Sequence, residues 1–169
     1  AGAGGFIGHH LVKFLKVKGY FVRGVDIKEP EYEKTLADEF LILDLKKENN
    51  TLEATKDIEH VYNLAANMGG IGFIETIHAE LMRDNVLIDT NMLEAAKING
   101  VKRFFYSSSA CIYPVYKQNK KKNPGLKESD AYPADPDNSY GWEKLFTERL
   151  CFDYYQDHGL ETRVARFHN

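Results

Sequence analysis

Short apolar runs alternate with longer helical patterns along this chain, and that alternation restricts the possible folds more than any other feature. The run 40–45 is nearly continuously apolar, which is typical of a strand buried on both faces. Strands joined by helices pair in parallel through right-handed crossovers. The sequence therefore predicts an α/β fold, a doubly wound parallel sheet with helices on both faces. Strands are expected over 20–27, 40–45, 60–66, 102–110 and 162–169, and helices over 6–18, 51–56, 74–99 and 138–158.

Glycines are concentrated at the start of the chain, directly before the first expected helix. Gly2, Gly5 and Gly8 fit G-x-x-G-x-x-G, and Gly2, Gly4 and Gly8 fit the related G-x-G-x-x-x-G. Glycine permits a positive φ, its missing Cβ lets the backbone approach a pyrophosphate, and free N–H groups at a helix N-terminus attract the anion. Glycines also occur in turns that bind nothing, so the motif alone is a weak indication of dinucleotide binding.

Asp26 strengthens that indication. It lies 18 residues after Gly8, at the end of the next expected strand. This is near the spacing of the carboxylate that binds the adenosine ribose hydroxyls in a Rossmann-type domain. Such a carboxylate repels a 2′-phosphate, so NAD is favoured over NADP. The alternative is that Asp26 only caps its strand.

A candidate catalytic pair lies on the last expected helix, where Tyr140 and Lys144 form Y-x-x-x-K and share one face. A phenol has a pKa near 10, and a neighbouring ammonium favours the phenolate and lowers that pKa. Ser107, Ser108 and Ser109 end the preceding strand, where a hydroxyl can bind the substrate oxygen that Tyr140 deprotonates. The alternatives are a chance pair on a solvated helix and serines that bind their own backbone.

Taken in order, these motifs resemble the extended short-chain dehydrogenase/reductase family, which contains nucleotide-sugar epimerases and dehydratases. The resemblance covers nearly all of the chain and rests on segments 1–8, 63–66 and 107–109 together with Asp26, Tyr140 and Lys144. Segments 67–74, 109–114 and 166–169 look like those of the family's 3,5-epimerases, which act on a GDP-hexose. Ala1 replaces a common threonine, and Trp142 replaces the leucine of the plant enzymes.

The resemblance implies the ligand contacts. Asp26 and Asp44 would contact the adenosine part of NAD, Lys144 the nicotinamide ribose, and Tyr140 would be the redox base. The other cofactor-binding residues would be Gly2, Gly4, Gly5, Phe6, Ile7, Gly8, Leu45, Leu64, Ala65 and Ala66, and the nucleotide sugar would contact Gly69, Ser109, Ala110, Cys111 and Asn169.

Cys111 separates the subfamilies. The resembled 4,6-dehydratases carry Asp-Glu where this chain has Ala110 and Cys111, and Ala110 cannot titrate, so dehydration is disfavoured. A thiol whose pKa falls modestly is a competent base near pH 7. Transient oxidation at C4 acidifies the protons on C3 and C5, and Cys111 with a partner beyond Asn169 would exchange them. The alternative is a small buried hydrophobe, the role expected for Cys151.

Other functions stay open. A nucleotide-sugar 4-epimerase, dehydratase or reductase would use the same scaffold, and a non-catalytic NAD-binding module would not need Ser109, Tyr140 and Lys144. Asn85 is either structural or orders water. His9 and His10 lack a metal-ligand spacing, so no metal site is expected. Lys120, Lys121 and Lys122 suggest a solvated face of the proline-rich loop 111–136, a length typical of functional loops.

Both ends of the sequence read as internal points of a longer polypeptide. A glycine turn of this kind normally follows a strand, and no residue precedes Ala1. We expect residues 1–169 to be one NAD-binding Rossmann domain without its first strand and its C-terminal substrate domain. The absent strand would leave interior edges unpaired, which predicts marginal stability for the isolated chain. When full length, the protein is expected to be a homodimer.

Composition excludes several classes of protein. The formal net charge is −3 with 43% hydrophobic residues, so there is no basic excess for nucleic acid, and the aromatic content is too high for a disordered chain. The sequence contains no run of 18 apolar residues, so no membrane-spanning helix is expected. Two cysteines far apart do not form a disulfide framework, which favours a reducing, cytoplasmic compartment.

Overall fold

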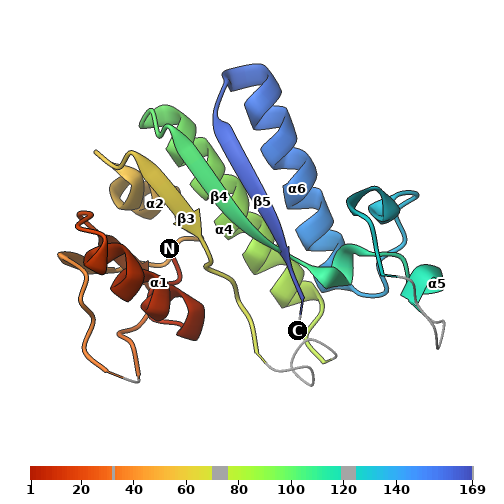
Figure 1. The fold of residues 1–169 in the computed structure, drawn as a ribbon, viewed down its shortest axis with the longest axis horizontal. Coiled ribbons are helices and arrows are strands. Elements are labelled where there is room, and N and C mark those ends of the chain that lie inside the picture. The colour runs from red at the N-terminus through yellow and green to blue at the C-terminus, as the bar shows by residue number, and fades with distance from the viewer. Residues whose placement is uncertain (32, 70–75, 119–124, 169) are drawn as a thin grey trace.

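The computed structural model describes residues 1–31, 33–69, 76–118 and 125–168. Five strands of these described residues form two parallel sheets. In the first, β1 (Arg23–Asp26) pairs with β2 (Glu39–Ile42), and in the second β4 (Arg103–Ser109) lies between β3 (His60–Asn63) and β5 (Glu161–Phe167) (Figure 1). The parallel, helix-connected order confirms the predicted α/β fold.

The first three residues connect the two sheets through backbone hydrogen bonds. The amides of Gly2 and Ala3 donate to the Val25 carbonyl of β1, at 2.8 and 3.1 Å. On the other side, the Ala1 amine donates to the Tyr62 carbonyl of β3 at 2.9 Å, and the Leu64 amide donates to the Ala1 carbonyl at 3.2 Å. The glycine segment therefore begins between β1 and β3, at their carboxyl ends. Towards the other end of these strands lies an apolar-lined cavity of about 580 Å³.

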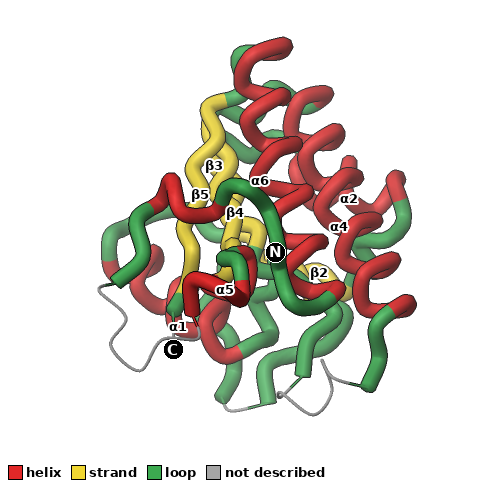
Figure 2. Tube along the Cα trace, turned by 90° about the vertical axis from the view of Figure 1, so that its right-hand side faces the viewer, coloured by secondary structure: helices red, strands yellow, loops and turns green. Residues whose placement is uncertain are grey.

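Helices cover both faces of the strands. Figure 2 shows α2 (Glu48–Thr55), α4 (Ala79–Ile98) and α6 (Ser139–His158) on one side and α1 (Phe6–Val17) on the other. The main core lies between the second sheet and α4 and α6. It includes Phe104 of β4, Leu93 and Ala96 of α4 and Cys151 of α6, all fully buried.

Helix α6 ends where its sequence predicts. Asn138 is the N-cap, and its Oδ1 accepts a hydrogen bond from the Gly141 amide at 2.9 Å. Gly159 follows the last turn with a φ of 70°, the left-handed conformation that glycine adopts without strain. These two caps fix the position of Tyr140 in the first turn of the helix.

Several boundaries differ from the sequence prediction. The long helix begins at Ala79, and Thr76 to His78 precede it; β-branched Thr76 and Ile77 are poor helix formers. The first strand starts at Arg23 because the Val22 amide donates to an Asp38 carboxylate oxygen. Strand β2 is not buried on both faces, because Glu39 and Ile42 are exposed and Phe40 and Leu41 are only half-buried.

The segment between β4 and α6 contains three short helices: η1 (Ala110–Ile112), α5 (Val115–Gln118) and η2 (Glu128–Ala131). Arg166 of β5 holds this segment in place. Its Nη1 donates to the Tyr113 hydroxyl at 3.0 Å and to the Glu128 carbonyl at 2.7 Å, and its Nη2 donates to Glu148 at 2.8 Å. The predicted loop is thus an ordered layer beside the sheet in its described part, and Lys120, Lys121 and Lys122 lie outside the described residues.

Candidate active site

A cleft of about 910 Å³ runs across the carboxyl ends of the strands, the usual ligand position in an open parallel sheet. Its walls come from the glycine segment, the ends of β1 to β4, the beginning of α6 and the end of β5. Residues predicted to bind the cofactor that line the cleft are Gly2, Gly5, Phe6, Ile7, Gly8, Asp26, Asp44, Leu45, Leu64, Ala65, Ala66, Tyr140 and Lys144.

The glycine segment is packed so tightly that side chains would not fit. Gly2 has a φ of 78°, and a Cβ there would lie 2.7 Å from the Leu64 carbonyl carbon. A Cβ on Gly8 would lie 2.0 Å from the Gly2 carbonyl oxygen. These contacts bring the start of α1 close to the end of β3, and Phe6, Ile7 and Gly8 of its first turn line the cleft. A phosphate-sized anion fits the chemistry of that turn.

Asp26 is both a structural cap and a free acceptor. Its Oδ2 accepts the Gly4 amide at 2.9 Å, and its Oδ1 accepts the Ile27 amide at 2.7 Å. A carboxylate has about four acceptor positions, so others remain for ribose hydroxyls. Asp26 therefore caps the end of its strand, as the alternative interpretation expected, and its carboxylate can still bind a ligand. Asp44 also lines the cleft, with Oδ1 accepting the Lys46 amide at 3.1 Å.

Tyr140 and Lys144 lie on the buried side of α6 at the deep end of the cleft. The Lys144 Nζ is 5.5 Å from the centre of the Tyr140 ring and 4.8 Å from that of Tyr106, and the lysine is 2% exposed. Burial raises the pKa of Tyr140 above its ordinary value, whereas the Lys144 charge and the Ser109 hydroxyl lower it. Lys144 thus lowers the pKa of Tyr140, as predicted. Without a bound ligand, however, the increase caused by burial is larger than this decrease.

Ser109 and Cys111 meet the start of α6. Ser109 ends β4, and its Oγ accepts the Cys111 amide at 3.2 Å as the cap of η1. A Cβ on Gly141 would lie 2.3 Å from the Cys111 carbonyl oxygen, so only glycine lets α6 approach η1 this closely. Ser107 instead donates to the Asn63 carbonyl at 3.1 Å. Among the three serines, Ser109 is thus the one beside both Tyr140 and Cys111.

Not every predicted substrate residue can be placed in the cleft. Gly69 is exposed and is not part of the described cleft lining. Ala110 and Cys111 lie in η1, directly beyond Ser109. Asn169 is outside the described residues. Cys151 is fully buried in the main core, as predicted.

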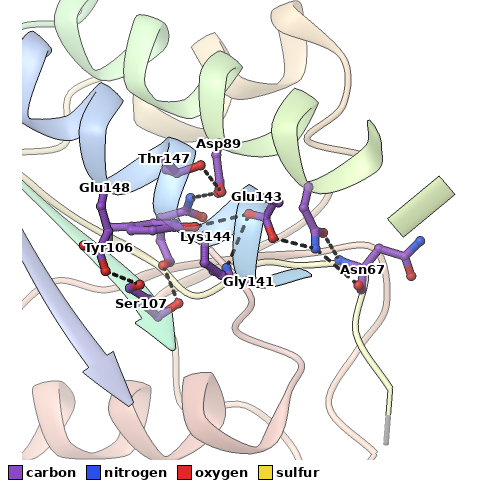
Figure 3. Close-up of polar contacts among 12 residues, drawn as sticks. Asn67, Asp89, Tyr106, Ser107, Gly141, Glu143, Lys144, Thr147 and Glu148 are labelled. Carbon is purple, nitrogen blue, oxygen red and sulfur yellow. Dashed lines mark hydrogen bonds and ion pairs between the residues drawn. The ribbon is translucent and has the colours of Figure 1, made fainter. Parts of the chain in front are cut away.

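A buried polar cluster that no sequence motif predicted lies around Lys144 of the catalytic pair. Figure 3 shows Glu143 among Asp89, Tyr106, Lys144 and Thr147. Glu143 is 0% exposed. Asn85 is structural here, because it contacts Glu143 and also accepts the Asn67 amide at 2.6 Å. The only signal in the sequence was a glutamate directly before the motif lysine.

The described residues include no helix that combines the length and the hydrophobicity needed to span a membrane. Within the same ranges, no three or more histidine, cysteine, aspartate or glutamate side chains are grouped so that they could hold a metal ion. His9, which is buried, has Nε2 3.1 Å from a Glu33 carboxylate oxygen.

The chain is similar to several known proteins. It is 52% identical to GDP-mannose 3,5-epimerase of Arabidopsis thaliana over 99% of this chain and 45% of that protein. It is 54% identical to GDP-mannose 3,5-epimerase 1 of Oryza sativa subsp. japonica, with the same coverage. The structure of Brucella ovis UDP-glucose 4-epimerase in complex with NAD superimposes with a TM-score of 0.84 at 25% identity, over 99% of this chain and 50% of that one.

The chain spans about half the length of the curated relatives that it matches. The model of one family matches all of the residues 1–169. On this full-length match, which agrees with the parallel fold and the glycine-lined cleft, the chain belongs to the NAD dependent epimerase/dehydratase family.

Proposed function

We propose that the protein is an NAD-dependent nucleotide-sugar epimerase that acts on a GDP-hexose in the manner of GDP-mannose 3,5-epimerase. The observation that carries this proposal is the meeting of a phenol and a serine hydroxyl, from Tyr140 and Ser109, in a cleft that begins at the glycine segment, with the Cys111 thiol two residues beyond Ser109 in η1. The identity of 52% to the Arabidopsis enzyme over 99% of this chain supports the choice of substrate class.

The residues of the cleft fit NAD. Gly2 and Gly8 permit the tight turn that a side chain at either position would prevent, and the N-terminal amides of α1 would bind the pyrophosphate. Asp26 and Asp44 offer carboxylates towards the adenosine end, and Lys144 would hold the nicotinamide ribose. When bound, NAD supplies a hydride acceptor that can later return the hydride.

Tyr140 is proposed to be the base at C4. Its phenolate would take the proton of the C4 hydroxyl, and Ser109 would donate a hydrogen bond to the same oxygen. Lys144 opposes the effect of burial, because its ammonium lowers the pKa of the phenol. Positioning of this kind is needed because an isolated phenol is almost fully protonated at neutral pH.

Cys111 is proposed to exchange protons on the neighbouring carbons. A carbonyl at C4 acidifies C3 and C5, and a thiolate next to them removes a proton that a second group on the other face replaces. Cys111 lies in η1 directly after β4 and is half-buried, so its side chain is not enclosed in the core. A 4-epimerase has no need for this proton exchange, since hydride removal and return invert C4.

Exchange with heavy water tests this proposal. The full-length protein is incubated with GDP-mannose in D₂O, and deuterium at C3 and C5 is read by NMR, with UDP-glucose as the competing substrate. The Cys111→Ala variant should lose exchange by about 10²–10⁴-fold and keep NAD binding. The matched control is Cys151→Ala, which removes the buried thiol of the core.

Two outcomes contradict the proposal. Unchanged exchange in Cys111→Ala removes the thiol from the reaction. Inversion of C4 in UDP-glucose, without deuterium at C3 or C5 of either sugar, identifies a 4-epimerase.

A further inference from the structure

The carboxyl groups of Asp89 and Glu143 and the ammonium of Lys144 lie close together (Figure 3). Glu143 is 0% exposed, Asp89 2% and Lys144 2%. They come from two helices, because Asp89 lies on α4 and the other two on α6. Burying a charge is costly unless an opposite charge and hydrogen bonds compensate it. One ammonium can balance one carboxylate, so the cluster has one carboxylate too many for its positive charge.

The two carboxyl groups differ in their hydrogen-bond partners. Asp89 accepts bonds on both oxygens, from Asn63 Nδ2 at 2.8 Å and from Thr147 Oγ1 at 3.0 Å. Glu143 accepts longer bonds from the neutral groups Asn85 Nδ2, at 3.3 Å, and Tyr106 hydroxyl, at 3.2 Å. The Lys144 ammonium is 3.8 Å from Glu143, longer than a hydrogen bond. Asp89 is therefore the better stabilised anion, and Glu143 is the site for a proton.

The charged and titratable groups around Glu143 favour the same assignment. Burial and the anionic Asp89 raise the pKa of Glu143 to about 8, against an opposing effect of Lys144. Tyr106 faces Glu143 from β4, and burial raises the pKa of that phenol too, so Tyr106 stays neutral. Burial lowers the pKa of Lys144, and Asp89 is the strongest of the groups that bring it above its ordinary value, so the lysine stays charged.

We propose that Glu143 is a positioning residue that is a neutral acid at neutral pH, and that its proton keeps the charge of Lys144 effective on Tyr140. With Glu143 protonated, Asp89 and Lys144 balance each other. When Glu143 loses its proton, a second buried anion forms 3.8 Å from the Lys144 ammonium and opposes formation of the phenolate. The effect on Tyr140 rests on the proposed function, whereas the protonation of Glu143 does not.

Infrared spectroscopy tests the proton directly, without substrate or NAD. The full-length wild type should show the carbonyl band of a protonated carboxylic acid at pH 6–7, which disappears as the pH rises through about 8. Glu143→Gln should lack this band. The matched control is Glu148→Gln on the same helix, because Glu148 forms an ion pair with Arg166 and does not belong to the Glu143 cluster, so that variant should keep the band. If Glu143→Gln does not fold, ¹³C-labelled glutamate in the wild type locates the band by its isotope shift.

A pH profile tests the effect on Tyr140. The single-turnover rate of NADH formation follows the phenolate, and each unit by which the phenol pKa rises lowers the phenolate population about tenfold. Glu143→Gln stays neutral at high pH, so its rate should exceed that of the wild type by up to about tenfold above pH 8, with equal rates near pH 6. A purely structural role would lower the rate equally at every pH.

The outcomes separate the two proposals. A band that persists in Glu143→Gln, or that is missing from the wild type at pH 6–7, overturns the assignment of the proton. Superimposable pH profiles overturn the effect on Tyr140. A titrating carboxyl band in a protein without epimerase activity contradicts the proposed function alone and leaves the protonated Glu143 in place.

Discussion

At the scale of single residues, the two cysteines show how position changes the chemistry of one side chain. Cys111 is half-buried in η1 at the end of β4. Cys151 is fully buried in the core, and burial raises the pKa of its thiol far above the ordinary value. The thiolate is the reactive form of cysteine, so a buried thiol with a raised pKa is inert.

Alkylation should therefore separate the two thiols. We expect iodoacetamide at pH 8 to modify Cys111 in the native protein at least about tenfold faster than Cys151. Peptide mass spectrometry after timed quenching measures both rates, and the same reaction in denaturant, where both thiols are accessible, is the control. Equal native rates would mean that α6 does not shield Cys151 as the structure shows.

The sequence distinguished these cysteines but did not reveal Glu143. Cys111 follows a serine run at a strand end, and Cys151 lies in the middle of an expected helix, so both patterns are local. The burial of Glu143 depends on Asp89 and Asn85 from another helix and on Tyr106 from a strand. A local sequence pattern does not show which distant segments will pack against a residue. By its sequence alone, a glutamate beside a lysine on a helix is usually expected to be solvated.

At the scale of elements, the contact between η1 and the first turn of α6 sets the position of Tyr140. Gly141 lies where a Cβ would come 2.3 Å from the Cys111 carbonyl oxygen and 2.8 Å from Pro136 Cβ. The Cys111 oxygen belongs to the backbone and the Pro136 Cβ to a rigid ring, so neither atom can easily move away. The start of α6 would therefore have to shift. A shift of about 1 Å in a catalytic group can cost about 10² in rate.

Gly141→Ala should thus reduce turnover about 10²-fold with a small change in melting temperature. Steady-state kinetics and thermal unfolding of the full-length protein measure the two effects. The matched control is Gly159→Ala at the other end of α6, where the φ is 70° and nothing lies within 4 Å of the new Cβ. That change should cost about 1–2 kcal/mol of stability and leave turnover unchanged. The reverse pattern would show that the start of α6 does not position Tyr140.

The elements themselves were predicted to different degrees. Helix α6 was predicted almost to the residue because its caps, Asn138 and Gly159, are local signals. Strand β2 was predicted in place but wrongly as buried on both faces, because the burial of a face depends on which distant elements pack over it. The short helices of segment 110–131 were missed, and contacts with distant Arg166 hold them.

At the scale of the whole molecule, the two sheets differ in how well they are supported. Strand β4 has a neighbour on each side and carries the fully buried Phe104 and Tyr106. Strand β2 has one neighbour and only half-buried or exposed residues. Ala1 to Ala3 link the sheets through the backbone hydrogen bonds to Val25, Tyr62 and Leu64. The β1–β2 sheet should therefore open more easily than the β3–β4–β5 sheet.

Hydrogen exchange tests this difference. Amides that open only through global unfolding exchange slowest, while weakly supported strands open locally at lower free energy. We expect the amides of β4 to be the last strand amides to exchange and those of β2 the first, with β3 and β5 between them. Native-state exchange read by NMR or mass spectrometry measures the order, and low concentrations of denaturant should accelerate β4 most steeply, because its amides exchange through global unfolding. Protection of β2 equal to that of β4 would show that both sheets unfold as one cooperative unit, with Ala1 to Ala3 joining them as strongly as the strands are joined within each sheet.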